Sequence, residues 1–121
     1  MTIGTDITEV KRIEQLVNTH AQFVTRVFTP REIAYCDQKK NKYEHFAARF
    51  AAKESVMKAV GKGWLQGLSW TDIEIINLPS GEPRVNAYGT LKEVMVQKNI
   101  TALSVSLSHC KNYAVAMVVA Q

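Results

Sequence analysis

The chain has 121 residues, 46% of them hydrophobic and 21% charged, which is typical of one globular domain, expected here over residues 1–121. No apolar run approaches the roughly 18 residues of a membrane-spanning helix, and no signal peptide is visible, so we expect a cytoplasmic protein without a membrane partner. The net charge of +4 favours an anionic partner without identifying it. Cys36 and Cys110 match neither a metal-binding spacing nor a disulfide framework, which indicates free thiols in a reducing compartment.

The first third of the chain predicts one strand and two helices. Residues 2–7 form a short strand in which Asp6 points to the side opposite the β-branched residues. A helix over residues 9–18 follows, with Thr8 as its expected cap and its apolar residues on one face. A second helix over residues 29–37 begins with Thr-Pro-Arg-Glu, which combines a capping residue, a proline at the first helical position and the glutamate of a capping box.

The rest of the chain predicts one long helix and then mostly strands. The long helix covers residues 43–60, is rich in good helix formers, and ends at Gly61 in the left-handed conformation. After a glycine-containing loop, we expect strands over 70–77 and 83–88, a helix over 90–98, and a hairpin of strands over 102–110 and 113–120. The fold class is therefore α+β, with one long and several short helices packed on one face of a mostly antiparallel sheet.

Asp6 is the first candidate for chemistry. A carboxylate within a short apolar strand is costly unless it is paired or bound to a cation. Gly4, two residues earlier, leaves room for another group to approach the backbone. An aspartate near a strand end can equally cap a helix or face solvent, and the strand pattern does not choose between these interpretations.

Glu54 and Lys58 are the second candidates, because a spacing of four places them on one face of the long helix. Small and apolar residues surround them on that face, among them Ala47, Phe50 and Ala51. One interpretation is a metal-binding glutamate beside a phosphate-binding lysine. The other is an exposed ion pair, worth only about 0.3–0.5 kcal/mol.

The strand over residues 104–108 carries a hydroxyl at every second position and ends at His109. Alternate hydroxyls suit a polar surface or the wall of a site, and His109 suits either a ligand or a structural role. His20 and His45 lack such a context and are expected to face solvent.

Basic residues cluster in the first third of the chain. Arg12 and Arg26 lie near the apolar Leu16 and Phe23, and together the four could form a patch for an acidic helix. The usual meaning of such charges is a solvated surface. The sequence contains no P-loop, dinucleotide fingerprint, zinc motif or nucleophile elbow.

Three motifs follow one another in an informative order. The first is GTDITEVKRI at residues 4–13; the second joins FTPRE at 28–32 to RFAAKESVMKA at 49–59. The third is SLSH at residues 106–109, followed by YAVA at 113–116. Together they cover nearly the whole chain, and the chain resembles the holo-acyl-carrier-protein synthase family of 4′-phosphopantetheinyl transferases.

This resemblance implies the 4′-phosphopantetheinyl transferase fold and an enzyme of fatty acid biosynthesis. Its reaction would move 4′-phosphopantetheine from coenzyme A to a serine of apo acyl carrier protein and release adenosine 3′,5′-bisphosphate. It also implies a homotrimer with active sites between subunits. Asp6 and Glu54 would bind the metal, Mg²⁺ or alternatively Mn²⁺, and with Lys58 they would form the catalytic set.

The same resemblance implies two binding surfaces. Coenzyme A contacts are implied at Arg49, Lys58, Gly61, Gly81, Pro83, Ser106 and His109. Acyl carrier protein contacts are implied at Arg12, Leu16, Phe23 and Arg26. Three positions depart from the family pattern: Thr5 and Cys110 are interpreted as packing changes, while Lys62 either contacts a phosphate or points to solvent.

The chemistry of phosphoryl transfer explains this residue set. The reaction needs positioning and neutralisation of charge on the phosphate oxygens. Mg²⁺ prefers carboxylates, waters and substrate phosphates, so two carboxylates from different elements would leave positions open for a diphosphate. A base must accept the serine proton, and Glu54, Asp6 or a water at the metal could do so.

Three other functions compete with this interpretation. A basic module that binds an acidic protein or RNA would explain the charge, but it leaves Asp6 and Glu54 without purpose and lacks the aromatic residues of an RNA-binding sheet, so we expect no nucleic acid. A broad-specificity transferase of the surfactin-synthetase-activating type would be about twice as long, with two such halves in one chain. A coenzyme A hydrolase is not excluded by the metal site.

Overall fold

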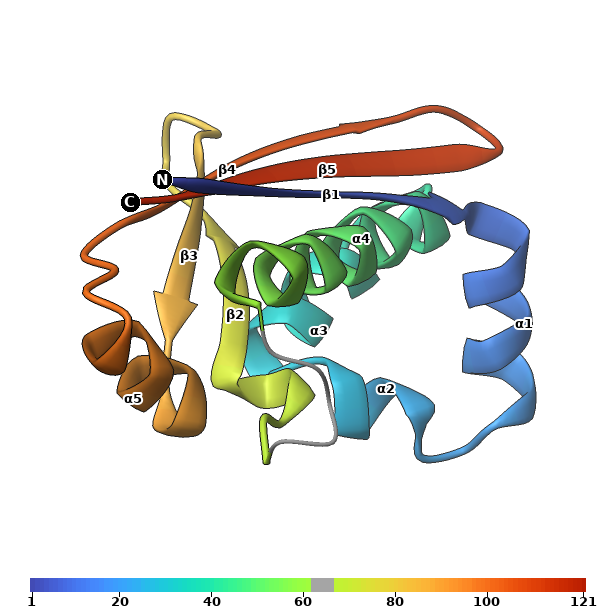
Figure 1. Cartoon of the computed structure of the whole chain (residues 1–121). Helices are drawn as coiled ribbons and strands as arrows, with labels where there is room; N and C mark the ends of the chain where they lie inside the picture. Colours follow the sequence, from blue (N-terminus) through green and yellow to red (C-terminus); the bar gives the residue numbers. More distant parts are fainter. Residues whose placement is uncertain (62–66) are drawn as a thin grey trace.

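The computed structural model describes residues 1–61 and 67–121, so the expectations for Lys62 and for Gly63 lie outside the described residues. The elements are β1 Thr2–Glu9, α1 Val10–Thr19, α2 Phe23–Val27, α3 Pro30–Asp37, α4 Lys42–Val60, the 3₁₀ turn η2 Trp70–Asp72, β2 Ile73–Asn77, β3 Pro83–Ala87, α5 Gly89–Gln97, β4 Leu103–His109 and β5 Tyr113–Ala120. Figure 1 shows the long helix α4 beneath the β1–β5–β4 sheet, with β2 and β3 at one end and α1 at the other.

The described strands form two antiparallel sheets, where the sequence predicted one. The larger sheet has the order β1-β5-β4, and the smaller pairs β2 with β3. The α+β class and the antiparallel pairing are confirmed. The pattern of alternating residues predicts strands but carries no information about which strands pair, because pairing depends on contacts between distant segments.

One face of the larger sheet packs on α4. Every second residue of β5 is buried there, and three of the four are alanine: Ala114, Ala116, Val118 and Ala120. Small side chains let the helix lie close to the sheet. The opposite face carries exposed apolar side chains, and no described helix covers it (Figure 1).

The helix α4 is buried on most sides, because the sheet covers one face while α1, α3 and β2 cover others. It carries two fully or almost fully buried basic residues, Arg49 at 2% and Lys53 at 0% exposure. A helix buried all round shows little amphipathic periodicity. Its sequence therefore predicts a helix but not which residue faces which neighbour.

Gly4 allows the closest approach between β1 and α4. A Cβ atom on this residue would lie 2.0 Å from the carbonyl oxygen of Ser55 and 2.7 Å from the backbone nitrogen of Ala59. The prediction that Gly4 leaves room for another group is confirmed, and the approaching group is the backbone of α4. This contact sets the distance between the strand that carries Asp6 and the helix that carries Glu54.

Two predicted helix ends are confirmed, and one predicted helix cap is corrected. Thr29 and Glu32 form the complete capping box of α3, and Gly61 ends α4 with a φ of +75°. The cap of α1 is Glu9, not Thr8, because β1 continues to Glu9.

The helix α2 was not predicted from the sequence, because its five residues are too few to show a helical period. Residues Trp70–Asp72 form a 3₁₀ turn, not the first residues of a strand. Both cysteines are free thiols, Cys36 buried and Cys110 exposed, as predicted. Among the described residues, no helix has the length and apolar character needed to cross a membrane.

Candidate active site

Asp6 and Lys58 meet at the edge of the larger sheet. Asp6 lies on β1, half-buried, and Lys58 Nζ lies 3.2 Å from its Oδ1 atom. The same ammonium group donates to the backbone oxygen of Thr5 at 2.9 Å, and the Thr8 hydroxyl donates to Asp6 Oδ2 at 2.9 Å. Thr8, which the sequence predicted as a helix cap, thus orients the carboxylate of Asp6, the candidate metal ligand.

Glu54 stands near the same group. Burial raises the pKa of the Glu54 carboxyl, the charge of Asp6 raises that pKa further, and Lys58 and Arg12 oppose both effects. Two carboxylates that repel each other across a partly buried gap are stabilised by a cation between them. Asp6, Glu54 and Lys58, which the sequence selected separately, therefore form one group between β1 and α4.

The donor set of this group fits a hard divalent cation. Across residues 1–61 and 67–121, no cluster of three or more His, Cys, Asp or Glu side chains is arranged to hold a metal. A cation held by Asp6 and Glu54 would therefore keep coordination positions for water and for substrate oxygens. That arrangement suits a metal shared between the protein and a phosphate-containing substrate.

A second group of candidate residues lines a cavity of about 170 Å³ on the other side of α4. The cavity brings together four of the residues for which coenzyme A contacts are implied: Arg49, Gly81, Pro83 and His109. Its other walls come from Tyr35, His45, Ala48, Asn77 and Leu107. The sequence placed these four residues in three separate segments, and only the fold unites them.

Arg49 is the strongest anion-binding group in this cavity. Its Nη2 atom donates to Asn77 Oδ1 at 2.5 Å, and its guanidinium carbon lies 4.0 Å from the centre of the Tyr35 ring. Its Nε atom is buried and has no hydrogen-bond partner among the described residues. A buried cation with an unused donor is costly unless an anion binds to it, so the cavity suits a phosphate group.

His109 is held at the rim of the same cavity. Its Nδ1 atom lies 2.9 Å from Glu44 Oε1, and its ring centre lies 4.9 Å from that of His45. His45 is half-buried, which corrects the expectation that it faces solvent. Burial lowers the pKa of His45, and the nearby His109 and Arg49 lower it further.

The turn between β2 and β3 forms another wall. The Asn77 amide donates to the backbone oxygen of Gly81 at 2.9 Å, and Gly81 has a φ of +91°, which favours glycine. Asn77 thus links Arg49 to the turn. The sequence reasoning missed Asn77, Tyr35 and Glu44, and the only signal for Asn77 was its position at the end of a predicted strand.

The two groups lie at opposite edges of the larger sheet. Asp6 is on the edge strand β1, His109 is on the edge strand β4, and β5 separates them (Figure 1). Asp6 and Leu107 both pair with Ala116 of β5, so two strand spacings, about 10 Å, separate β1 from β4. One chain therefore carries the two groups at opposite edges of the same sheet, and we refer to them below as the two candidate half-sites.

Three implied coenzyme A contacts lie outside the Arg49 cavity. Lys58 and Gly61 line a separate hollow of about 530 Å³ next to the first group. Ser106 lies exposed on the outer face of β4, whereas its neighbour Leu107 lines the Arg49 cavity. Because strand residues alternate, Ser106 points away from the Arg49 cavity of its own chain.

The candidate carrier-protein surface is continuous with the first group. Leu16, Phe23 and Arg26 line a hollow of about 450 Å³ at α1 and α2. Phe23 lies 6.3 Å from Phe50, measured between ring centres, and the Arg12 guanidinium lies 5.8 Å from the Phe50 ring. Since the charge of Arg12 also acts on Glu54, this surface leads directly to the candidate metal ligands.

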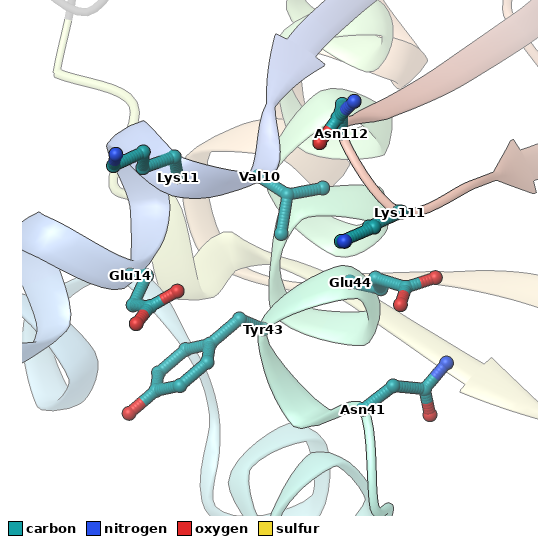
Figure 2. A pocket seen from close by; sticks show the side chains of 8 residues that line it. All are labelled: Val10, Lys11, Glu14, Asn41, Tyr43, Glu44, Lys111 and Asn112. Atoms are coloured by element: carbon teal, nitrogen blue, oxygen red, sulfur yellow. The ribbon is translucent and has the colours of Figure 1, made fainter.

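A further hollow of about 310 Å³ lies between the start of α1, the first turn of α4 and the β4–β5 turn (Figure 2). Figure 2 shows side chains of both charges around it, Lys11 and Lys111 with Glu14 and Glu44. It contains none of the predicted site residues. Glu44 connects it to the Arg49 cavity, because the same carboxylate contacts His109.

Known proteins resemble this chain over nearly its whole length. The family profile described as the 4′-phosphopantetheinyl transferase superfamily matches residues 2–118. The chain is 46% identical over 119 residues to a holo-[acyl-carrier-protein] synthase of Dehalococcoides mccartyi, a match that covers 98% of this chain and 96% of that protein. It is 44% identical over 117 residues to the corresponding protein of Geobacter sp. strain M21, covering 96% of this chain and 94% of that protein.

The fold is shared over the same length. The crystal structure of Helicobacter pylori holo-[acyl-carrier-protein] synthase in complex with coenzyme A superimposes with a TM-score of 0.84 at 36% identity. The superposition covers 98% of this chain and 99% of that one. Because the family profile matches almost the whole chain and these relatives are 44–46% identical over nearly their full lengths, the chain belongs to the holo-[acyl-carrier-protein] synthases of the 4′-phosphopantetheinyl transferase superfamily.

Proposed function

We propose that the chain transfers 4′-phosphopantetheine from coenzyme A to a serine of apo acyl carrier protein, with adenosine 3′,5′-bisphosphate as the second product. The observation that carries this proposal is the group formed by Asp6, Glu54 and Lys58 between β1 and α4. It combines two carboxylates for a cation with an ammonium group for phosphate oxygens. Phosphoryl transfer requires this combination of positioning and charge neutralisation.

The metal would be Mg²⁺, with Mn²⁺ as the alternative, held by Asp6 and Glu54. When bound, the ion neutralises charge on the diphosphate of coenzyme A. Lys58 adds a second positive charge from the side of α4, and beside its bonds to Thr5 and Asp6 its ammonium group has a third N–H for a phosphate oxygen. Glu54, Asp6 and a water remain the candidates that accept the serine proton.

The Arg49 cavity would receive the adenosine end of coenzyme A. Support comes from the unpartnered Nε atom of Arg49 and from His109, which the Glu44 carboxylate holds in place. Both groups suit a phosphate, and Gly81 and Pro83 of the β2–β3 turn line the same cavity, where the adenine base would lie. The related proteins of Helicobacter pylori and Bacillus anthracis have been crystallised with coenzyme A or its adenosine bisphosphate part.

A homotrimer would join the two half-sites. Within one chain they lie at opposite edges of the sheet, so one coenzyme A molecule reaches both more easily if the β1 edge of one copy faces the β4 edge of the next. The uncovered face of the sheet supports such an assembly. It exposes large apolar side chains, namely Ile3 at 61%, Ile7 at 67%, Tyr113 at 49%, Val115 at 41% and Met117 at 50% exposure.

The carrier protein would dock on α1 and α2. Arg12 and Arg26 supply charge for an acidic partner, and Leu16 and Phe23 supply apolar contact around a hollow. The Arg12 side chain lies between this surface and Glu54, so a serine on the docked partner would face the candidate metal ligands. Association should weaken as salt is added, since steering by rim charges depends on ionic strength.

The single domain and the cytoplasmic location stay predictions.

The test is the intact mass of an apo acyl carrier protein after incubation with this protein, coenzyme A and Mg²⁺. We expect a mass increase of one phosphopantetheine group, and we expect EDTA or Glu54→Ala to abolish it. Coenzyme A cleavage without a mass increase would identify a hydrolase instead. No mass increase on several apo carrier proteins, with intact coenzyme A, would contradict the transferase.

A further inference from the structure

A fully buried ion pair, Glu32 with Lys53, lies in the centre of the molecule and has no part in the function proposed above. Both side chains are 0% exposed, and Lys53 Nζ lies 2.8 Å from Glu32 Oε1. The same ammonium group donates to the backbone oxygens of Trp70 at 3.1 Å and Ile73 at 2.5 Å. All three of its protons therefore have acceptors.

Glu32 is equally well satisfied. Its Oε1 atom accepts from the backbone nitrogen of Thr29 at 2.8 Å, and its Oε2 atom accepts from the backbone nitrogen of Ile75 at 2.8 Å. The pair thus connects four elements: the first turn of α3, the middle of α4, η2 and β2. Each hydrogen bond weakens when its distance or direction changes, so a shift of one of these elements against the others would weaken part of the network.

Stability by itself does not explain why such a pair is present. Removing two charges from water costs several kcal/mol per ion, and replacing a buried pair by apolar residues is often neutral or stabilising. What a buried pair can add is a unique arrangement of its neighbours, as a polar residue fixes the register of a coiled coil. The location of Lys53 on α4 indicates that the arrangement concerns this helix and the strands next to it.

Lys53 lies between the two half-sites on the same helix. It directly precedes Glu54, which faces Asp6, and it follows Arg49 by one helical turn. Lys53 binds β2 at its first residue, Ile73, while Arg49 binds the last residue of β2, Asn77. Two basic residues of α4 thus hold both ends of one strand. A rotation or slip of α4 would break these bonds and displace Glu54 at the same time.

We propose that Lys53 and Glu32 are positioning residues that set the rotation and register of α4, and so align both the Asp6–Glu54 pair and the Arg49 cavity. This inference rests on the proposed metal role of Glu54. The pair acts through the helix and touches neither substrate nor metal. Its loss should therefore weaken metal binding and turnover in a protein that is still folded.

The test compares three variants with the wild type. The double variant Glu32→Gln/Lys53→Met removes both charges and keeps the side-chain volumes. Lys53→Met alone leaves the buried Glu32 carboxylate unpaired. The control, Arg31→Met, removes the ion pair with Glu74, in which the arginine side chain is 63% exposed. Near-UV circular dichroism and urea unfolding establish that each variant folds. The affinity for Mn²⁺, measured by electron paramagnetic resonance of the free ion, needs no substrate and reports on the carboxylates directly.

For the folded double variant we expect Mn²⁺ affinity to fall at least fivefold and kcat at least tenfold, with a higher KM for coenzyme A. For Arg31→Met, the Mn²⁺ affinity, kcat and KM should each stay within twofold of the wild type. A folded double variant with wild-type Mn²⁺ affinity, KM and kcat would overturn the inference, whatever its stability. If the wild type transferred nothing to apo carrier proteins, the proposed function would fail, while the Mn²⁺ comparison would still decide the positioning role.

Discussion

Gly4 shows how one residue can determine the geometry of a site two residues away. Its missing side chain lets β1 lie against the backbone of α4, and Asp6 follows on the same face of the strand. With β1 held at this distance, Asp6 and Glu54 stand on facing elements around one gap. A larger residue would have to push the strand away from the helix, because backbone atoms cannot move aside as side chains do.

Gly4→Ala should therefore be strongly destabilising. The new Cβ would lie 2.0 Å from a carbonyl oxygen, and overpacking of this kind costs about 1–3 kcal/mol, with a clash against backbone at the upper end. Urea unfolding would measure the loss. Glu93→Ala, on the exposed side of α5, is the control and should change the free energy of unfolding by less than about 0.5 kcal/mol. Equal midpoints for both variants would contradict the close approach.

At the scale of elements, the start of α3 is tied to β2. The Thr29 hydroxyl accepts from the Glu32 backbone nitrogen at 3.3 Å and donates to Glu74 Oε2 at 2.6 Å. Glu74 also accepts from the Tyr88 hydroxyl at 3.0 Å. One hydroxyl thus caps a helix and satisfies a buried carboxylate on a strand 45 residues later.

Thr29→Ala should cost about 1–2 kcal/mol, since it removes the cap and one partner of Glu74. Thr29→Ser keeps the hydroxyl and should recover most of that loss. Thermal or urea unfolding of the two variants side by side measures the difference. If serine and alanine destabilised the protein equally, the missing methyl group and not the hydroxyl would be the cause.

His45 makes the contact between α4 and β4 sensitive to pH. Burial lowers its pKa below the ordinary value of 6.5, so the unfolded chain binds this proton more readily than the folded protein does. The contribution of His45 to stability is therefore complete above pH 6.5 and declines as the pH falls through 6.5 toward the lowered value.

The wild type should consequently lose more stability between pH 7.5 and pH 5.5 than His45→Gln, which has no proton to gain. The measurement is the urea midpoint of both proteins at both pH values. The difference between the two proteins reports on His45 together with its effect on the neighbouring His109. A larger loss in the variant would contradict the direction of this shift.

At the scale of the whole molecule, the two half-sites make a specific prediction about assembly. Glu54→Ala should disable one half-site and Arg49→Met the other. If active sites form between copies, a random mixture of the two inactive proteins contains intact sites at about one quarter of all interfaces. We expect transferase activity to return to roughly that fraction of the wild type after co-refolding.

The matched control mixes Asp6→Ala with Glu54→Ala. Both substitutions affect the same half-site, so no interface regains an intact pair and the mixture should stay inactive. No recovery in the first mixture would show that each site is complete within one chain. Recovery in this control would show that Asp6 and Glu54 of one site come from different copies. The assay is the mass increase of the carrier protein, with analytical ultracentrifugation to determine the number of copies.

Much of the local structure was determined by the sequence alone. The capping box at Thr29, the left-handed Gly61 and the long helix depend on interactions within a few residues, which are visible in the residue order. Asp6, Glu54 and Lys58 also became candidates from the sequence, because a charge in an apolar strand and a charged pair at helical spacing stand out against their neighbours, and the family resemblance implied their roles. Thr8 was assigned wrongly, since a cap and a ligand-orienting hydroxyl look alike in sequence.

Only the tertiary structure decided how these residues combine. The division into two sheets, the cavity that joins Arg49 to His109, and the position of Asp6 and His109 at opposite edges all depend on contacts between segments far apart in the chain. The same is true of the ion pair between Glu32 and Lys53, because the sequence shows Glu32 as the glutamate of a capping box and Lys53 as a helix residue without relating the two. Local sequence patterns predict which helices and strands form. Which side chains are buried, and which residues contact one another, depends on the packing of the whole chain.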